Sequence, residues 1–554
     1  MRTDHGSLPD NRIPNRRVAC IRTMIFGHSD WPAIGFSRVG SVATTTSAPR
    51  RPIDPEFLAL PMRDLADAAL SAAGSAGAQF CDFRCERTCV GNLLVRDTAV
   101  QDASESTGTG YAVRVIVDGV WGFASGFVFT PDAVAATGRR AVEVARALAG
   151  VVAERLERAA EPVHTDVSWS SEYQVDPFRV PVSERLALLL DRSERLLAQD
   201  AVAHTTSSLL QIKENKFYAD SAGTLTTQQR IRLQPGLEAV AVDSASGSFE
   251  TMRSLVPPVG RGYEYLTSSS ADAGWDFDTE IAVIGEALPE KLKAPSIDAG
   301  RYDLVIDPSN LWLTIHESIG HATEYDRAIG YEAAYAGTSF ATPDQLGTLR
   351  YGSEVMNVTG DRTAPHGLAT IGFDDDGVAG QQWDLISGGT LVGYQLDRVF
   401  AHKLGLDRSN GCSYADSPSH TPIQRMANVS LQPAPDGGST ADLISGVEDG
   451  IYVVGDKSWS IDMQRYNFQF TGQRFYRIRA GQLAGQVRDV AYQATTTDFW
   501  GAMDAVGGAG TFVLGGAFNC GKGQPGQVAA VSHGCPSARF RGISILNTTE
   551  QGVA

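Results

Sequence analysis

The sequence predicts an α+β fold: an N-terminal mixed domain of antiparallel strands and two long helices, followed by a C-terminal β-rich domain. Three observations support this prediction. Apolar residues recur at helical spacing in two long stretches of the first half. Around these stretches apolar and polar residues alternate with a period of two, broken by Gly and Asp-Gly turn signals. After about residue 335 the chain is Gly-rich, with short alternating stretches and few helical patterns.

The N-terminal domain is predicted to span residues 55–293. Its strongest helical pattern opens with a Pro-Asp pair. Proline is favoured in the first turn of a helix, so this pair indicates where the helix begins. Its strands are separated by glycine-containing breaks, which favours antiparallel hairpins. In chain order, the predicted elements are a helix beginning near Pro55, strands within 78–130, a helix from Pro131 with an apolar stripe reaching Leu156, a helix over 183–199 and strands within 202–256.

The C-terminal domain is predicted to span residues 294–554, with Ala294–Gly300 as the hinge. A short apolar strand, Tyr302–Ile306, follows the hinge. Asp307 or Ser309 then caps the start of a helix, since both residue types accept hydrogen bonds from the first helical N–H groups. The rest of the domain is predicted to be mainly strands.

The chain has 554 residues and a formal net charge of -17. A strongly acidic surface repels the phosphates of nucleic acids and of anionic lipids. No uninterrupted apolar stretch reaches the roughly 18 residues that a membrane-spanning helix needs. We therefore expect neither nucleic acid nor a membrane as a partner.

Residues 1–54 differ from the rest of the chain. Residues 1–53 contain eight Arg and no Lys, with three Asp and no Glu, and they lack the continuous apolar segment of a secretory signal. We predict a basic, disordered N-terminal extension. The seven cysteines are few and odd in number, unlike a disulfide framework. A cytoplasmic, reducing compartment is therefore expected.

Two histidines and a glutamate lie together in residues 316–321, His-Glu-Ser-Ile-Gly-His, just after the predicted helix start. In the zinc pattern H-E-x-x-H the histidines are four residues apart and face one ion. Here they are five apart. On an ideal helix the two side chains would then lie about 140° apart around the axis and about 7.5 Å apart along it, too far to bind one zinc. The pair can share a metal only if the helix widens into an i to i+5 turn. Gly320 is where such a distortion costs least.

A catalytic zinc site needs three protein ligands and one open position, so a third ligand has to come from elsewhere. Cys520 is the most prominent candidate because it lies in a Gly-rich turn after an apolar stretch, and the adjacent Lys522 would favour its thiolate. The other candidates in the C-terminal domain are His366, His402, His420, His533, Cys412, Cys535, Glu324, Asp326 and Glu332.

Two further clusters are interpreted as structural. Cys81, Cys85 and Cys89 lie four residues apart in a predicted strand, where they share a face without converging on an ion. The run Asp374–Asp376 resembles a calcium loop only in its charge, because the EF-hand ligand pattern is absent. We interpret this run as a solvated turn.

The motifs together resemble the TldD/PmbA metallopeptidase family. The resemblance is carried by H-E-x-x-G-H at 316–321, by Cys520–Gln524, by Arg425–Asn428 and by Gly534–Pro536, and it extends over nearly everything from about residue 58. Further similar segments are Cys81–Glu86, Gly110–Arg114, Gly122–Phe123, Asp376–Val378, Gly388–Leu391 and Gly446–Tyr452.

This resemblance implies a zinc peptidase that hydrolyses unfolded or flexible peptides, with one Zn²⁺ per catalytic chain. The family's ligands correspond to His316, His321 and Cys520, so the helix of the C-terminal domain would carry the metal site. Glu317 corresponds to the general base that takes a proton from the metal-activated water. Because the PmbA branch lacks the histidine motif, the chain resembles the TldD-type, catalytic branch.

Partners and alternatives also follow from the resemblance. It implies a homodimer, or a heterodimer with a motif-less PmbA/TldE-type sister chain. One alternative function is a non-catalytic or regulatory subunit of such an assembly. Another is a dipeptidyl peptidase III-like zinc exopeptidase, which takes its third ligand from a Glu in a downstream helix. Residues that could line the site and steady an oxyanion are His402, Arg425, Tyr452 and His533.

Overall fold

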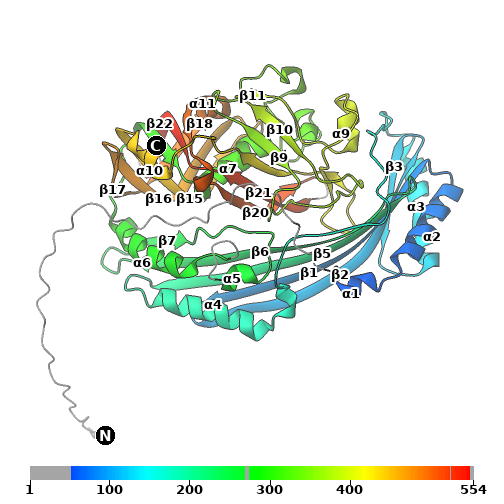
Figure 1. The fold of residues 1–554 in the computed structure, drawn as a ribbon, viewed down its shortest axis with the longest axis horizontal. Coiled ribbons are helices and arrows are strands. Elements are labelled where there is room, and N and C mark those ends of the chain that lie inside the picture. Colours follow the sequence, from blue (N-terminus) through cyan, green and yellow to red (C-terminus); the bar gives the residue numbers. More distant parts are fainter. Residues whose placement is uncertain (1–51, 269–273, 524–525, 550–554) are drawn as a thin grey trace, which may run out of the picture. The chain divides into compact units, whose positions relative to one another are not determined.

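A computed structural model describes residues 52–268, 274–523 and 526–549. The predicted disordered extension, except for its last three residues, lies outside this described part. Long antiparallel strands with helices form the first half, and shorter strands dominate the second half (Figure 1), which confirms the predicted α+β fold. The described residues of both halves belong to one compact unit. The division into domains at residue 294 stays a prediction.

The first half is built on a sheet that has seven strands among the described residues. Most neighbours are antiparallel, and β4 lies parallel to β6. β1 and β5 pair along almost their whole lengths, so the sheet is unusually long in the strand direction. Its order is β3 (Val120–Gly126), β2 (Ala99–Val117), β1 (Phe80–Arg96), β5 (His204–Asp220), β6 (Leu225–Val242) and β4 (Val167–Ser170), with β7 (Phe249–Arg253) paired to β6.

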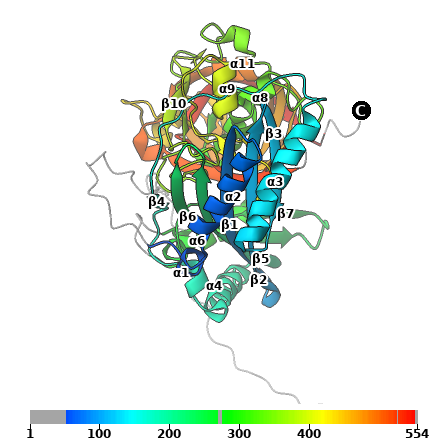
Figure 2. The same cartoon turned by 90° about the vertical axis from the view of Figure 1, so that its right-hand side faces the viewer.

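Four long helices cover one face of this sheet (Figures 1 and 2). α2 (Met62–Ser75) and α3 (Pro131–Leu148) pack at one end, and α4 (Val182–Leu197) and α6 (Phe277–Lys293) pack at the other. The odd-numbered residues of β1, among them the three predicted structural cysteines, point to this apolar side because side chains alternate along a strand. The short helices of this half are α1 (Pro55–Leu58), η1 (Pro177–Arg179) and α5 (Glu264–Thr267).

Two helix predictions in this half need correction. α3 ends at Leu148 instead of continuing to Leu156, and the side chain of Val151 is 78% exposed. Gly150 follows the helix end, and glycine disfavours continuation of a helix. The sequence also did not predict α6, which contains Pro289 in its interior, where proline removes a helical hydrogen bond.

The opposite face of the first sheet is polar and is buried against the second half of the chain. Arg114 of β2 forms an ion pair with Asp376, and Lys216 of β5 donates to Asp375 Oδ2 at 2.7 Å. Asp374–Asp376 is fully buried, so its interpretation as a solvated turn is wrong. The cations that neutralise this run lie more than 150 positions away in the sequence, which is why local charge suggested solvent instead.

The second half contains a sheet that closes on itself. β15 pairs with β8, β8 with β22, β22 with β18, β18 with β16, and β16 again with β15. β8 and β15 are parallel, whereas the other pairs of this ring are antiparallel. The strands are β8 (Gly300–Ile306), β15 (Asp449–Ile461), β16 (Asn467–Arg479), β18 (Val490–Thr495) and β22 (Ala538–Asn547), with β17 (Gln482–Val487) on β16 and β19 (Met503–Val506) on β22.

Helix α7 (Pro308–Ile315) follows β8 directly and lies between this ring and the hairpin of β20 (Val513–Lys522) and β21 (Gln527–Cys535) (Figure 1). Its Leu311, Leu313 and Ile315 are part of the largest apolar core. The C-terminal end of α7 thereby meets β20, which comes from the other end of the second half.

The other elements of the second half are short. A small sheet, in the order β11 (Thr390–Leu391), β10 (Gln382–Ser387), β9 (Val358–Asp361) and β14 (Asn428–Leu431), packs through β14 against β21. The remaining elements are η2 (His316–Gly320), α8 (Tyr325–Ala328), η3 (Pro343–Gln345), α9 (Arg398–Lys403), β12 (Ser413–Tyr414), β13 (Ile423–Gln424), α10 (Thr440–Ser445), α11 (Thr496–Gly501) and η4 (Ala509–Thr511).

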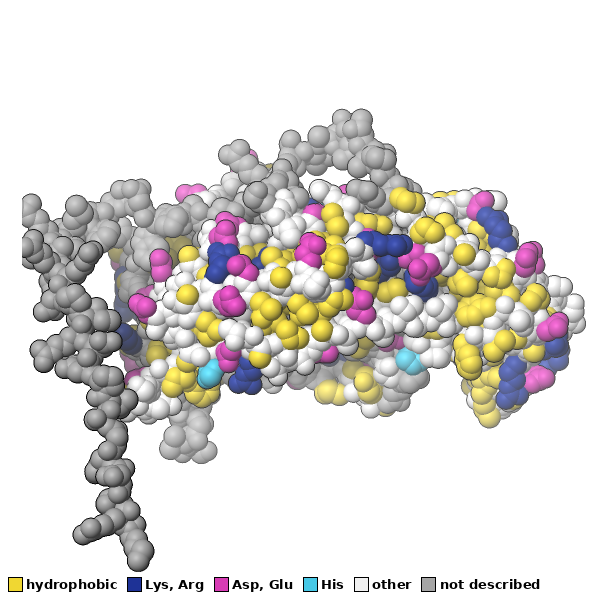
Figure 3. Space-filling view, turned by 90° about the horizontal axis from the view of Figure 1, so that it is seen from below, with side chains coloured by type: hydrophobic (Ala, Val, Ile, Leu, Met, Phe, Trp, Pro, Cys, Tyr) yellow, Lys and Arg dark blue, Asp and Glu magenta, His cyan; other side chains and the backbone are white. Residues whose placement is uncertain are grey.

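Surface and composition features bear on the predicted partners. On the face shown in Figure 3, Lys and Arg side chains are interspersed with Asp and Glu and do not form one basic stripe. Within the described residues, no helix is long and apolar enough to cross a membrane. The six described cysteines are buried and free.

Candidate metal centre

The helix that begins at Pro308 changes its hydrogen-bonding pattern at the histidine motif. The side chain of Asp307 accepts from Ser309 N at 3.0 Å and so caps α7, as one of the two predicted caps. From His316 to Gly320 the backbone forms a π-helical turn, and His321 N–H donates to His316 O at 3.0 Å. This i to i+5 bond confirms the predicted local widening of the helix.

Neighbouring side chains satisfy the backbone groups that the π turn displaces. Gln395 Nε2 donates to Gly320 O at 2.7 Å, and the hydroxyl of Tyr351 donates to Ser318 O. Trp500 Nε1 donates to Ser318 Oγ at 3.0 Å. Buried polar groups without a partner cost free energy, so these contacts stabilise a turn that would otherwise be rare.

Gly320 is needed for close packing. A Cβ at this position would lie 2.6 Å from Sδ of Met426 and 2.9 Å from its Cε. Gly320→Ala is therefore expected to lower the free energy of unfolding by about 1 kcal/mol, the low end for overpacking, because the flexible end of the buried Met426 side chain has to shift. The measurement is urea denaturation. Gly510→Ala is the control, because a Cβ at Gly510 meets nothing within 4 Å, and an equal loss in both variants would contradict the packing argument.

Two imidazoles and a thiol converge at the end of the π turn. The ring centroids of His316 and His321 are 4.7 Å apart, and Cys520 Sγ lies 3.7 Å from His321 Nε2. The ligand atoms of the three residues lie within 4.8 Å of one another, and all three side chains are buried. Tetrahedral zinc with bonds of about 2.0 to 2.3 Å holds its ligand atoms roughly 3.3 to 3.7 Å apart. Small side-chain movements therefore suffice for one ion, and the residue types fit zinc.

His533 determines which ring nitrogen of His316 can bind a metal. His533 Nδ1 lies 2.9 Å from the carbonyl oxygen of Val429, and a carbonyl only accepts, so this nitrogen carries the proton. Burial and the adjacent His316 hold the pKa of His533 well below its usual value, so the ring is neutral and its Nε2 accepts. His316 Nδ1 then donates to His533 Nε2 at 2.7 Å. This leaves the Nε2 lone pair of His316 free for a metal.

His321 is oriented by a carboxylate. Its Nδ1 donates to Glu324 Oε2 at 2.8 Å, which directs Nε2 towards Cys520. Burial alone would raise the pKa of Glu324, but Lys522, His321 and Arg327 hold it well below its ordinary value. A carboxylate behind a ligating histidine fixes the ring and increases its basicity. Glu324, a candidate ligand in the sequence, therefore lies behind the centre and not in it.

The pKa of the Cys520 thiol is lowered by His321 and Arg425, and not by Lys522 as predicted. Burial raises the pKa of Cys520, but His321 and Arg425 outweigh burial and lower it below its ordinary value. Lys522 Nζ instead donates to Glu324 Oε1 at 2.9 Å, to Asp326 Oδ1 at 2.8 Å and to Gln424 Oε1 at 2.6 Å. The expectation that Lys522 keeps the thiolate ionised is therefore wrong, because β20 turns its side chain towards these acceptors.

Glu317 lies beside the three converging residues without being one of them. Its Oε2 accepts from Arg465 Nη1 at 2.6 Å. Burial would raise the pKa of Glu317, but the charges of His321, His316 and Arg465 lower it. A carboxylate in this position can accept a proton next to the cluster.

The four residues predicted to line the site have different positions. Arg425 is buried and donates to the backbone oxygens of Cys520 and Gln527, so it supports β20. Tyr452 donates to Asp307 Oδ2 at 2.7 Å, at the start of α7. His533 orients His316, as described above. His402 is not at the centre: it is half exposed on α9 and pairs with Glu157 at 2.9 Å. Arg465, which contacts Glu317, was not predicted.

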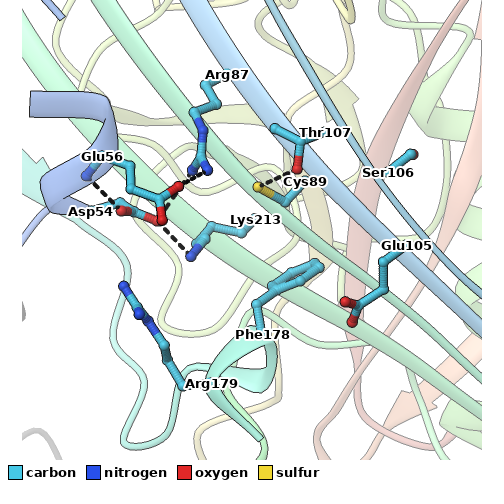
Figure 4. A pocket seen from close by; sticks show the side chains of 10 residues that line it. All are labelled: Asp54, Glu56, Arg87, Cys89, Glu105, Ser106, Thr107, Phe178, Arg179 and Lys213. Carbon is cyan, nitrogen blue, oxygen red and sulfur yellow. Dashed lines mark hydrogen bonds and ion pairs between the residues drawn. The ribbon is translucent and has the colours of Figure 1, made fainter. Parts of the chain in front are cut away.

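The described part also contains a cavity of about 230 Å³ on the first sheet (Figure 4). None of its lining residues belongs to the metal centre. Lys213 Nζ lies 2.7 Å from Asp54 and 2.9 Å from Asp176, and Arg87 lies 3.2 Å from Asp54. Two of its three cations, Lys213 and Arg87, are already paired with carboxylates, so this cavity is a weaker candidate than the metal centre.

Comparisons with known proteins agree over both halves of the chain. Residues 299–547 match the PmbA/TldA metallopeptidase C-terminal domain, and residues 81–147 match PmbA/TldA metallopeptidase domain 1. A protein of Methanothermobacter thermautotrophicus named metalloprotease is 28% identical, covering 90% of this chain and 100% of that protein. A Saccharolobus solfataricus protein named zinc metalloprotease TldD homolog is 21% identical, covering 86% and 98%.

A solved structure has the same fold. The crystal structure of TldE from Thermococcus kodakarensis gives a TM-score of 0.62 at 16% identity and covers 87% of this chain and 99% of that chain.

Proposed function

Because the chain belongs to the PmbA/TldD metallopeptidase family, we propose that it is a zinc-dependent peptidase with His316, His321 and Cys520 as ligands. The observation that carries this proposal is the convergence of three buried ligand atoms, with both imidazoles presenting an unprotonated Nε2. Two imidazoles and a thiolate suit zinc, and three protein ligands leave one position open, as catalytic sites require. The name of the Saccharolobus solfataricus relative supports zinc as the ion.

The residues around the proposed ion have separate roles in peptide hydrolysis. A zinc ion bound there would supply Lewis acidity, polarising a peptide carbonyl and making a water more acidic. Glu317 takes the proton of the attacking water and later gives it to the nitrogen of the leaving amine. His533 and Glu324 keep the ligand imidazoles in the required tautomers.

Metal removal tests this function directly. Dialysis against 1,10-phenanthroline is expected to abolish cleavage of an unfolded, fluorogenic peptide, and one equivalent of Zn²⁺ is expected to restore it, because the proposed mechanism needs the metal to make the attacking water more acidic. Cleavage is followed by fluorescence and zinc by mass spectrometry. Full cleavage by protein shown to be metal-free would contradict the proposal.

The tautomer of His316 gives a second test. His533→Leu removes the acceptor for His316 Nδ1–H, so zinc affinity is expected to fall about 10- to 100-fold, the usual effect of losing a group behind a metal ligand. His533→Gln is the matched control, because its side-chain oxygen can still accept from His316. Competition with a fluorescent zinc chelator measures both affinities. Equal affinities in the two variants would mean that this hydrogen bond does not orient His316.

Unfolded or flexible peptides are proposed as substrates, and a homodimer or a heterodimer with a motif-less PmbA/TldE-type sister chain as the working assembly. The likeness to TldE supports this, because it shows that chains of that branch share the fold. Mass measurement in solution, with and without a co-expressed sister chain, distinguishes the two assemblies. A chain that stays monomeric in both cases would rule out both.

The two alternative functions are supported less well. A non-catalytic subunit has no need of a complete set of His316, Glu317, His321 and Cys520 in one buried cluster. A dipeptidyl peptidase III-like site takes its third ligand from a Glu in a downstream helix. The described α9, α10 and α11 contain no Glu, and the third residue that converges with His316 and His321 is Cys520.

A further inference from the structure

One basic side chain at the metal centre is accessible from outside. Arg327, Arg425 and Lys522 also lie close to the centre, but each is fully buried behind the ligands. Arg465 lies in front of them: its side chain remains 14% exposed, and its Nη1 is 2.6 Å from Glu317 Oε2. Of these four cations, Arg465 is the one that a substrate could reach.

The guanidinium of Arg465 has hydrogen-bond donors to spare. An arginine side chain carries five N–H groups. In the structure Nη1 contacts Glu317, Nη2 makes one long contact of 3.5 Å to Ala336 O, and Nε is buried without a hydrogen-bond partner. Three of its five N–H groups therefore remain uncommitted, so the guanidinium can donate to a further acceptor without losing its contact to Glu317.

The backbone fixes where this guanidinium lies. Arg465 occupies the tip of the β15–β16 hairpin with a φ of 65°, a left-handed conformation that is unfavourable for residues other than glycine. The carboxylate of Asp462 accepts from three backbone N–H groups of the tip, those of Gln464, Tyr466 and Asn467. Thr496 Oγ1 donates to Arg465 O at 2.7 Å. These contacts hold a strained backbone so that the side chain points at Glu317.

We propose that Arg465 is a catalytic residue that donates hydrogen bonds to the substrate carbonyl oxygen as this oxygen becomes negatively charged. The inference rests on the peptidase function proposed above and adds a residue to its chemistry. It follows from position: the water that Glu317 deprotonates attacks a carbonyl carbon next to Glu317, so the carbonyl oxygen lies within reach of the group bound to that carboxylate. Preorganised donors aimed at a developing oxyanion are among the largest contributions to catalysis.

The step balances without a further reactant. As the water oxygen bonds to the carbonyl carbon, the π electron pair moves to the carbonyl oxygen and one water proton moves to Glu317. When the tetrahedral species collapses, that electron pair re-forms the C=O bond, the C–N bond breaks, and its pair on nitrogen takes the proton from Glu317. Arg465 keeps its protons and its charge throughout, and it stabilises the oxygen only while the oxygen is negative.

Kinetics of Arg465→Met and Arg465→Lys test this assignment. Both residues are unbranched at Cβ and meet the same backbone strain as arginine. We expect kcat of Arg465→Met to fall about 10²- to 10³-fold, as when an oxyanion donor is removed, with KM within a few-fold and an unchanged zinc content. Arg465→Lys should recover part of kcat. The control Arg479→Met, at the other end of β16 with a 61% exposed side chain, should match wild type.

Binding of a phosphinate peptide separates direct contact from an effect through Glu317. Its tetrahedral, anionic phosphinyl group imitates the species that Arg465 is proposed to stabilise. Arg465→Met should weaken phosphinate binding by about the same factor as kcat/KM, and should do so equally in the Glu317→Gln background. A loss that disappears in that background would show that Arg465 only positions Glu317, and would overturn the proposal.

Other outcomes are equally decisive. A rise in KM with unchanged kcat, or unchanged phosphinate affinity in Arg465→Met, overturns the assignment while leaving the peptidase function standing. A wild-type protein that contains zinc but neither cleaves peptides nor binds the phosphinate overturns the peptidase function, and the role of Arg465 with it.

Discussion

Glu317→Gln is expected to reduce kcat for peptide cleavage by about 10²- to 10⁴-fold, the usual contribution of a general acid–base group. Glutamine has nearly the same shape and can still accept from Arg465, but it cannot take a proton from water. Because Glu317 is not one of the three converging residues, zinc content should stay at the wild-type level. The measurement combines steady-state cleavage of a fluorogenic peptide with metal analysis of the same sample.

The control for this variant is Glu354→Gln. Glu354 has a 91% exposed side chain that pairs with Arg350 and belongs to none of the contacts described at the centre. It should retain wild-type kcat. If Glu317→Gln cleaves peptide as fast as wild type while retaining zinc, another group is the base and the mechanism proposed here is wrong.

Cys520→Ala is expected to remove zinc from the purified protein, and with it all peptide cleavage. Two imidazoles alone bind zinc far less tightly than two imidazoles and a thiolate, and thiolate is the softest of the three ligands. A bound ligand stabilises the folded state by mass action. Added zinc should therefore raise the melting temperature of wild type but not of Cys520→Ala, which differential scanning calorimetry measures.

Cys535→Ala provides the matched control for Cys520→Ala. Cys535 is also free and buried and belongs to the same β20–β21 hairpin, but it lies outside the three converging residues. Burial raises its pKa well above the ordinary value, so it is a protonated, inert thiol. Equal loss of zinc in both variants would mean that the hairpin as a whole, and not the Cys520 sulfur, determines binding.

Local features of the sequence predicted the helix cap and the π turn at the histidine motif. The five-residue spacing of His316 and His321 excludes a regular helix around one ion, so a shared metal predicted the i to i+5 turn that the backbone forms. Asp307 was a recognisable cap because capping depends on the neighbouring two residues. Cys520 was the most prominent of the candidates because of its Gly-rich turn, and the resemblance to a known family then implied that it is the third ligand.

Features that depend on contacts between distant chain segments could not be predicted from the sequence. His533 was one candidate among many, because its role requires Val429 on one side and His316 on the other. Arg465 gave no signal at all, since its position depends on the length and bulge of the β15–β16 hairpin. The burial of Asp374–Asp376 likewise depends on cations of the first sheet.

The central claim is that His316, His321 and Cys520 together hold one zinc ion, and X-ray absorption at the zinc edge tests it most directly. For purified wild-type protein the account predicts about one zinc per chain. One sulfur neighbour is expected at about 2.3 Å and imidazole nitrogens at about 2.0 to 2.1 Å, with the sulfur neighbour missing in Cys520→Ser. A zinc shell of nitrogen and oxygen only in the wild-type protein, or the same sulfur signal in Cys520→Ser, would contradict it.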